Sequence, residues 1–322
     1  MMPFARYIAF AIAVLPVAGA AAADYPTKPV RMLVAFAPGG GTDIIGRIAA
    51  QGISEILGQS VVVDNRPGAG GNIGTELVAR AQPDGYTLIT GGTGSHAINP
   101  SLYPKIPYDA VKDFAPVCLV AETPYLMVVP VSVPARTVKE FIEIAKASPG
   151  KMNMASSGAG GMPHLAGELF KIMTGVQLAH IPYKGTGAVF PDLIAGRMHV
   201  LFGDIVATYP YVQADRLRAL GITSTKRAAQ LPNIPTIAEG GVPGYDAVGW
   251  FAVFAPAKTP HSAIMKLNEA IIKFVRRPEH KDRLAALGAE IVASSPEELA
   301  RIQRQDIVRW AKVVKESGAK AE

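Results

Sequence analysis

The sequence predicts an α/β protein with room for two domains. Strand-like apolar runs alternate with helix-like runs through most of the chain, which is typical of βαβ units and a mostly parallel sheet. The order of strand, glycine-rich turn and helix begins at residue 30 and appears a second time from residue 152. The chain has 322 residues, which is enough to bury two hydrophobic cores.

Residues 1–23 are predicted to be a signal peptide and therefore not part of the fold. Arg6 supplies a basic start, residues 7–18 supply an apolar core, and Ala21-Ala22-Ala23 fits a cleavage site, so the mature chain is expected to begin at Asp24. The apolar core is shorter than the roughly 20 residues that span a membrane, and no cysteine is present at the cleavage site for lipid attachment. We expect an exported protein that is not anchored.

Strands are expected where short apolar runs end at glycine, proline or polar residues. They lie at residues 30–36, 60–64, 86–90, 117–121, 125–129, 152–155, 200–204, 217–223 and 250–255, with one more ending within 180–185. Helices are expected where apolar residues recur at helical spacing. They lie at residues 44–57, 73–81, 137–147, 163–173, 188–195, 261–275, 279–287 and 296–316. Residues 99–114 and 225–245, which are rich in proline and glycine, are expected to be irregular.

The charge pattern argues against nucleic acid as a partner. The formal net charge is +6, and lysine and arginine are scattered without a run of five or more. A modest positive charge suits an anionic ligand, although surface solubility is the simpler explanation. Cys118, the only cysteine, lies in an apolar run and is expected to be a buried, unreactive thiol without a disulfide.

Three glycine-rich turns follow strands and lead into helices, and they are the candidate binding loops. They are residues 38–43, 91–96 and 156–161. In an open parallel sheet, ligands bind at the carboxyl ends of the strands. A helix N-terminus offers unpaired N–H groups and a partial positive charge, which favour an anion, and glycine lets the backbone approach it closely. One such loop is ordinary turn chemistry, but three loops from both halves of the chain predict a site.

Motifs for nucleotide binding, metal binding and nucleophilic catalysis are absent. The sequence has no Walker A motif, no Gly-x-Ser-x-Gly motif and no metal-binding spacing among its six histidines. Residues 92–97 match a dinucleotide-binding pattern after a strand, but Pro100 and Pro104 prevent a long helix from following. We therefore expect no catalytic residue, no metal ion and no cofactor.

Several residues near the glycine loops have more than one interpretation. Asp43 and Asp204 are acid–base candidates, but Asp43 also suits a loop-fixing role on backbone N–H groups. Asp204 suits contact with a ligand amine, a water or a neighbouring lobe. His164 lies just inside the second glycine-loop helix, where it either contacts a ligand or packs at the helix start. Three aromatic residues either wall a pocket or pack in the core, namely Phe36, Tyr183 and Trp250.

A series of short segments, each ordinary by itself, occurs in an order that is specific. The segments include Phe36-Ala37-Pro38-Gly39-Gly40-Gly41-Thr42-Asp43, Asp64-Asn65-Arg66-Pro67-Gly68-Ala69-Gly70-Gly71, Pro83-Asp84-Gly85-Tyr86-Thr87-Leu88, Pro182-Tyr183-Lys184-Gly185 and Asp192-Leu193-Ile194-Ala195-Gly196. In these segments, and along nearly all of the chain after the predicted signal peptide, the sequence resembles the extracytoplasmic receptors of tripartite tricarboxylate transporters, also called the Bug receptor family.

The resemblance implies a periplasmic-binding-protein-like fold of two α/β lobes, with a hinge and a ligand cleft between the lobes. Residues 24–124 and 250–322 would form lobe 1, and residues 125–249 would form lobe 2. The hinge would lie where the chain crosses between the lobes, near residues 122–125 and 248–250. The implied function is that of a monomeric periplasmic receptor that captures a small organic carboxylate and delivers it to the permease subunits of such a transporter in the membrane.

The resemblance also implies the binding residues. A carboxylate would lie between the glycine loop of the first lobe and the Ser/Gly loop of the second, often with bridging waters. The expected contacts, with His164 added from its position in the helix, are Phe36, Pro38, Gly39, Gly40, Gly41, Thr42, Asp43, Thr93, His96, Ser156, Ser157, Gly158, His164, Tyr183 and Asp204. No arginine or lysine lies in the glycine loops, so binding would rest on backbone N–H groups, hydroxyls and helix ends.

Two other functions stay open on the sequence. A sensor that presents a carboxylate to a membrane receptor shares every pocket feature. An enzyme that acts on a carboxylate would lose turnover when Asp43, His164 or Asp204 is replaced. The carboxylate itself also stays open, because aspartate-like, citrate-like, aromatic and nicotinate-like ligands all suit such a site. An amine-bearing ligand would favour a role for Asp204.

Overall fold

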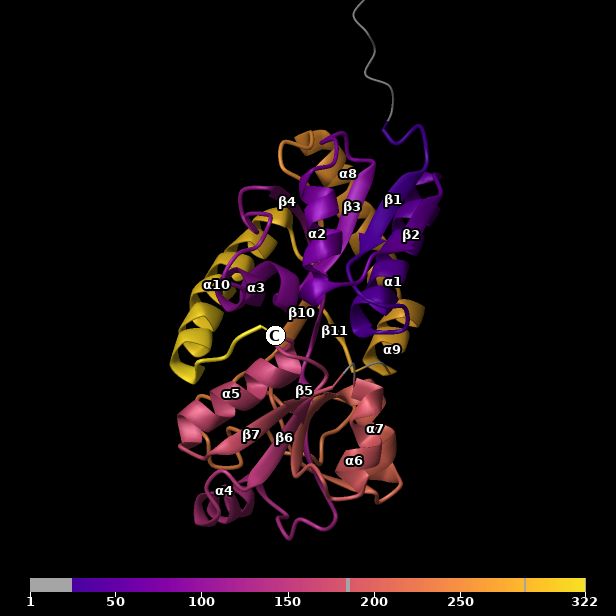
Figure 1. The fold of residues 1–322 in the computed structure, drawn as a ribbon. Coiled ribbons are helices and arrows are strands. Elements are labelled where there is room, and N and C mark those ends of the chain that lie inside the picture. The colour runs from indigo at the N-terminus through magenta and orange to yellow at the C-terminus, as the bar shows by residue number, and fades with distance from the viewer. Residues whose placement is uncertain (1–24, 184–185, 287, 322) are drawn as a thin grey trace, which may run out of the picture.

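A computed structural model of the protein describes residues 25–183, 186–286 and 288–321. The predicted signal peptide lies outside the described residues. The described chain forms two mixed sheets that carry helices, and it has the two-lobe α/β fold that the sequence predicts (Figure 1). None of the helices in these residues combines the length and the apolar composition needed to cross a membrane.

The sheet of the first lobe has six strands in the order β11-β4-β10-β3-β1-β2. They are β1 (Val30–Val34), β2 (Val61–Asn65), β3 (Thr87–Gly92), β4 (Phe114–Thr123), β10 (Gly249–Pro256) and β11 (Glu290–Ile291). Helices α1 (Gly41–Leu57) and α8 (His261–Val275) pack on one face. Helices α2 (Asn72–Ala79) and α10 (Pro296–Ser317) pack on the other. Because both faces are buried, strands such as β1 consist mainly of apolar residues.

The sheet of the second lobe has five strands in the order β7-β6-β8-β5-β9. They are β5 (Tyr125–Pro130), β6 (Met152–Ser156), β7 (Leu178–Pro182), β8 (Val200–Asp204) and β9 (Leu217–Ile222). The helices of this part are α4 (Val138–Ala147), α5 (Met162–Thr174), α6 (Phe190–Ile194) and α7 (Ile205–Gln213). Helix α10 packs against both β4 of the first sheet and α5 of the second lobe, so it bridges the two (Figure 1).

The expectation of a mostly parallel sheet is wrong, because each sheet contains an inserted antiparallel strand. Strand β10 lies antiparallel between β3 and β4, and β5 lies antiparallel between β8 and β9. Both strands enter their sheet directly from the other lobe. They therefore start at the edge where β3 and β8 end, and they must run the opposite way. The predicted division of the chain at residues 124/125 and 249/250 stays a prediction, and it falls beside these two crossings.

Two helical segments were not predicted, and proline explains both. Helix α7 contains Pro210 in its interior and has little difference between its faces, so the sequence gives no amphipathic signal. After β3, a helical turn, η2 (Gly94–Ile98), begins within the predicted glycine loop, and the stretch expected to be irregular from residue 99 starts with the short helix α3 (Asn99–Leu102). Proline at the start of α3 is compatible with a helix because its missing N–H would be unpaired there in any case.

The first lobe includes the only cysteine of the chain, and its thiol behaves as predicted. Cys118 is fully buried and forms no disulfide. Burial raises the pKa of this thiol to about 12, so it is neutral at physiological pH.

The second lobe is built on a cluster of aromatic rings. Phe170 of α5 packs against Phe141, Phe202 and Tyr245 with ring centroids 5.7–6.2 Å apart, and it is fully buried. We expect Phe170→Ala to lower the free energy of unfolding of this lobe by about 3–5 kcal/mol, because the cavity left behind cannot be refilled. Urea unfolding followed by fluorescence measures the loss. Val308→Ala, at a site that is 72% exposed, is the control and should change the value by less than about 0.5 kcal/mol.

Candidate functional site

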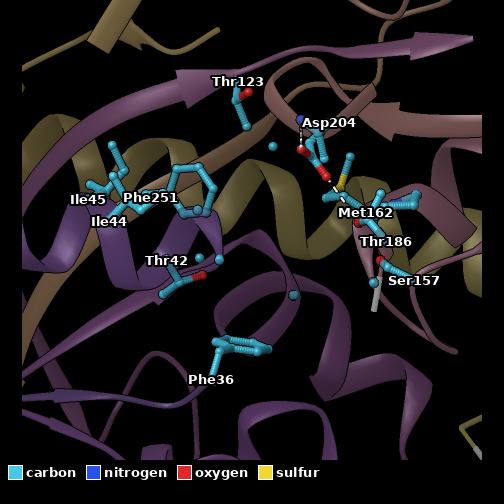
Figure 2. Close-up of a pocket in the computed structure, with 18 of the residues that line it drawn as sticks. Phe36, Thr42, Ile44, Ile45, Thr123, Ser157, Met162, Thr186, Asp204 and Phe251 are labelled. Carbon is cyan, nitrogen blue, oxygen red and sulfur yellow. Dashed lines mark hydrogen bonds between the residues drawn. The ribbon is translucent and has the colours of Figure 1, made fainter. Parts of the chain in front are cut away.

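A cavity of about 570 Å³ lies between the two sheets, at the ends of their strands (Figure 2). Its lining comes from both lobes and from the crossings that join them. Of the residues predicted from the sequence, the lining contains Phe36, Pro38, Gly39, Gly40, Gly41, Thr42, Thr93, Ser157 and Asp204. The structure therefore brings the three glycine loops to one place.

The loop between β1 and α1 forms one wall, and the buried carboxylate of Asp43 holds its shape. Asp43 Oδ2 accepts hydrogen bonds from the Gly39 amide and from Arg47 Nε, both at 3.0 Å. Asp43 Oδ1 accepts a bond of 2.9 Å from the Asn65 side chain, which also donates to the carbonyl of Phe36. Gly39 has a φ of 87°, which glycine adopts without strain. The loop-fixing interpretation of Asp43 fits these contacts, and Asp43 itself does not line the cavity.

Helices α1 and α5 both begin at the cavity without a side-chain cap. Their N-cap residues are Gly40 and Gly161, which have no side chain to bind the first N–H groups. The cavity lining includes Gly41 and Thr42 of α1 and Met162 and Pro163 of α5. The partial positive charge of both helix ends therefore faces a shared space, which favours an anion. Uncapped N–H groups come mainly from α1, because in α5 Pro163 has no N–H and the His164 N–H is bonded to the Gly161 carbonyl.

The loop between β6 and α5 is held from behind by Ser156. Ser156 Oγ lies 2.6 Å from His180 Nε2 and donates to the Gly158 carbonyl at 3.0 Å. A serine beside a histidine is the geometry of a nucleophile with its base, but Ser156 has no exposed surface and does not line the cavity. Its neighbour Ser157 lines the cavity instead.

His164 also supports this loop from outside the cavity. Its Nδ1 accepts a hydrogen bond of 3.0 Å from the Gly160 amide, and its Nε2 lies 3.5 Å from Glu168. The rings of His164 and His180 are stacked with centroids 3.7 Å apart. Burial first, and then the neighbouring His164, lower the pKa of His180 to about 4, so it is neutral at physiological pH. The structure thus gives His164 the packing role rather than a place in the lining.

His96 is a core residue and not a ligand contact of the cavity. Its ring is fully buried and stacked on Phe254 with centroids 4.2 Å apart, while Nδ1 lies 2.8 Å from Ser95 Oγ. Burial lowers the pKa of His96 to about 3. The sequence placed His96 correctly after a strand, but the helical turn η2 directs its ring into the sheet packing. Thr93, three residues earlier, lines the cavity, and its hydroxyl accepts a bond from the Trp250 amide.

Tyr183 and Gly158 are the remaining predicted residues that do not line the cavity. The Tyr183 hydroxyl donates to Asp192 at 2.7 Å, and its amide donates to the carbonyl of Ser156. Burial first, and then the bond to Asp192, raise the pKa of Tyr183 to about 12. Tyr183 therefore supports the second glycine loop through its amide, and Gly158 belongs to that loop without lining the cavity.

Asp204 is the one carboxylate in the described lining. It caps α7, because its Oδ1 accepts a bond of 2.9 Å from the Ala207 amide. Its Oδ2 accepts a bond of 3.0 Å from Thr186 Oγ1 (Figure 2). No lysine or arginine occurs among the lining residues that the structure describes.

The sequence reasoning missed several lining residues that are far apart in the chain. They are Ile44, Ile45, Thr123, Tyr125, Met162, Pro163, Thr186, Gly187, Ala207, Phe251 and Ala289, whereas Gly92, Gly94 and Gly161 belong to the predicted loops and Gly249 to the predicted hinge. Thr123 and Tyr125 lie within the predicted hinge, and a hinge residue borders an interlobe cleft, so this signal was available. Trp250, which the sequence singled out, also lines the cavity.

Two glycines are needed because lining rings pack against their backbone. A Cβ on Gly41 would lie 2.7 Å from the ring of Phe251, and one on Gly249 would lie 2.8 Å from the Tyr125 hydroxyl. A side chain at either position would displace a wall of the cavity. Among the described residues, no group of three or more His, Cys, Asp or Glu side chains is placed to hold a metal ion.

Comparison with known proteins places the chain among related receptors. A family model described as the tripartite tricarboxylate transporter family receptor matches residues 45–319. Protein BugT of Bordetella pertussis (strain Tohama I) is 38% identical over 311 residues, which cover 96% of this chain and 95% of that protein. The UPF0065 protein in the tcbD-tcbE intergenic region of Pseudomonas sp. (strain P51) is 40% identical over 293 residues, with coverage of 91% and 87%.

Solved structures agree with this similarity. An R. palustris protein with adipate has 39% identity and a TM-score of 0.85, covering 93% of this chain and 100% of that chain. The periplasmic binding protein BugD has 35% identity and a TM-score of 0.81, with coverage of 92% and 100%. MatC from Rhodopseudomonas palustris with bound malate has 32% identity and a TM-score of 0.80, with coverage of 90% and 100%.

The network around Asp43 predicts a pH-dependent contribution to stability. Burial by itself would raise the pKa of Asp43, but hydrogen bonds from Arg47, Gly39 and Asn65 lower it below its ordinary value of 3.8. The carboxylate therefore stabilises the fold above that pH, and this contribution is lost as the pH falls through the lower folded-state pKa.

We expect Asp43→Asn to lower the free energy of unfolding at neutral pH by about 1–3 kcal/mol, because it weakens a buried network. Thermal melts at a series of pH values should show the gap between wild type and variant narrowing below pH 3.8. A gap that is constant across the acid range would contradict the role assigned to the charge.

Proposed function

Because the chain belongs to the tripartite tricarboxylate transporter receptor family, we propose that it is a periplasmic solute-binding protein that captures a small organic carboxylate between its two lobes. The observation that carries this proposal is the cavity into which two uncapped helices, α1 and α5, direct their N-termini from opposite lobes. The related proteins with adipate and malate are consistent with such a ligand.

A carboxylate is bound here without a cationic side chain from the described lining. The backbone N–H groups of Gly41 and the hydroxyls of Thr42 and Ser157 are the donors placed at the cavity. Hydrogen bonds to an ionised acceptor are roughly twice as strong as neutral ones, and closure of the lobes strengthens them by excluding water. Micromolar affinity needs about 8 kcal/mol, which a few such bonds together with closure supply.

The biological role that we propose is delivery of this carboxylate to the membrane permease of a tripartite tricarboxylate transporter, by an exported, monomeric receptor without catalytic activity. Of the three side chains that suggested an enzyme, Asp43, His164 and Asp204, only Asp204 lines the cavity, and it caps α7. Asp43 and His164 are occupied in holding loops, and Ser156 has no exposed surface. A sensor that presents the ligand to a receptor kinase would use the same cavity, and a pull-down of membrane partners with liganded protein distinguishes the two.

Ligand binding is expected to raise the thermal stability of the protein. A carboxylate at 100 times its dissociation constant stabilises the folded state by about 2.7 kcal/mol, which moves the melting temperature by several degrees. A thermal-shift screen of ligand-free protein against mono-, di- and tricarboxylates measures this. The Thr42→Ala/Ser157→Ala double variant should weaken binding of the hit at least about fivefold, because each lost hydroxyl removes roughly 0.5–1.5 kcal/mol.

The Thr27→Ala/Ser224→Ala double variant is the matched control, since it removes two hydroxyls outside the lining. Its affinity for the hit should equal that of the wild type. If no carboxylate of the panel changes the melting temperature, the proposal of carboxylate binding is rejected. That result would not contradict the fold.

Closure of the lobes is a second expected consequence. Small-angle X-ray scattering should show a smaller radius of gyration when the ligand is added, because the lobes approach each other about the crossings near Thr123 and Gly249. A ligand that binds in calorimetry but leaves the radius of gyration unchanged would contradict the closing mechanism.

A further inference from the structure

We propose that Asp204 selects carboxylates that carry an amine, or another cationic group, at the end remote from the anchored carboxylate. This inference rests on the proposed function and narrows its ligand class. It predicts that amino-carboxylates bind more tightly than dicarboxylates of the same chain length.

The position of Asp204 places its charge at the cavity. Asp204 is the last residue of β8 and is paired with Tyr125, the first residue of β5, in the antiparallel register. Directly paired residues on neighbouring strands have their side chains on the same face of the sheet, and both line the cavity. Figure 2 shows Asp204 across the cavity from Phe36 and Thr42, on the side opposite the first glycine loop.

No cationic side chain of the described residues pairs with Asp204, although the N-terminus of α7, which it caps, offsets part of its negative charge. Its two hydrogen-bond donors, the Ala207 amide and the Thr186 hydroxyl, are both neutral. No side chain in the described residues forms an ion pair with it. An ionised carboxylate offers about four lone-pair sites, so two accepted bonds leave capacity for a ligand donor.

The helix cap alone does not require this charge. Serine, threonine and asparagine cap helices about as well as aspartate does, since the cap needs only one oxygen acceptor. The sequence nevertheless places the only charged side chain of the described lining at this position. An acid at the cavity wall thus does something that the cap leaves unexplained, and attraction of a cation is the interaction it offers.

The electrostatics of the two ends of the cavity are opposite in sign. On the side of Phe36 and Thr42, the N-terminus of α1 favours a carboxylate, whereas α5 begins on the side of the cavity that carries Asp204. Near Asp204, a second ligand carboxylate would meet a like charge, whereas an ammonium group would meet an opposite charge and a hydrogen-bond acceptor. Tyr125 stays protonated beside it, because burial first and then the charge of Asp204 raise its pKa.

The wall between these ends suits an apolar ligand body. Ile44 and Phe251 line the cavity together with the aromatic ring of Phe36 (Figure 2). A short methylene chain would contact these side chains and connect the two charged ends. The volume of about 570 Å³ is in the range of small-molecule sites.

The test compares three ligands of one chain length by isothermal titration calorimetry on ligand-free protein. They are ω-aminohexanoate, adipate and hexanoate, which place a cation, an anion or a methyl group at the remote end. A shorter set, γ-aminobutyrate, succinate and butyrate, covers a second length. For the better-bound length, we expect the amino-carboxylate to bind at least about tenfold more tightly than the dicarboxylate.

The variant Asp204→Asn is nearly isosteric and keeps an oxygen for the helix cap. It should reduce the preference for the amino-carboxylate over the dicarboxylate by at least about tenfold, while the affinity for the monocarboxylate changes little. Asp204→Ser keeps the cap with a different side chain and should give the same loss of preference. Asp84→Asn removes one carboxylate at an exposed site outside the lining, and it should retain the preference of the wild type.

The outcomes separate this inference from the proposed function. Dicarboxylate binding that is equal to or tighter than amino-carboxylate binding in the wild type would overturn the inference and support the receptor function. A wild-type preference that persists in both Asp204 variants would also overturn it. The absence of binding by every carboxylate of both sets would reject the proposed function together with the inference.

Discussion

The structure depends on two places where the chain passes from one sheet directly into the other. Strand β4 ends at Thr123 and β5 begins at Tyr125, while β10 begins at Gly249, opposite Thr123. These crossings require the ends of β1, β3, β6 and β8 to meet at one level of the molecule. The mixed sheets, the cavity and the opposed helix N-termini all follow from that constraint, because each helix begins where its strand ends.

Most of what the sequence could predict is local. Glycine loops after apolar runs, the helix starts and the loop-fixing role of Asp43 depend on residues within a few positions, and Gly39, Gly41, Thr42 and Ser157 do line the cavity. The inserted antiparallel strands were not predictable from alternation alone, because strand direction is set by where the chain arrives in space. His96 was misplaced for a related reason. The residue follows a strand as expected, but the turn η2 directs its ring toward Phe254.

The site divides its side chains between two tasks. Asp43, Ser156 and His164 lie outside the lining and hold the glycine loops through hydrogen bonds to backbone atoms. The loops then present backbone N–H groups, whose positions are fixed by the fold. Replacing the side chain of a loop residue does not remove the N–H group of that residue. Anchoring of an anion is therefore a property of the backbone, and the polar groups behind the loops contribute by keeping that backbone in place.

If the anchor belongs to the backbone, selectivity must come from the few side chains that project into the remaining space. The resemblance to known receptors covers the anchor well, because its glycines lie in the segments that carry the resemblance, and it leaves most of the selecting side chains unassigned. Tyr125 illustrates the difference, since it lies beside the expected contact Asp204 only through the pairing of β5 with β8. A change at such a position alters the electrostatics of one end of the cavity without disturbing the other. One scaffold can thus bind carboxylates that share an anchored end and differ in everything beyond it.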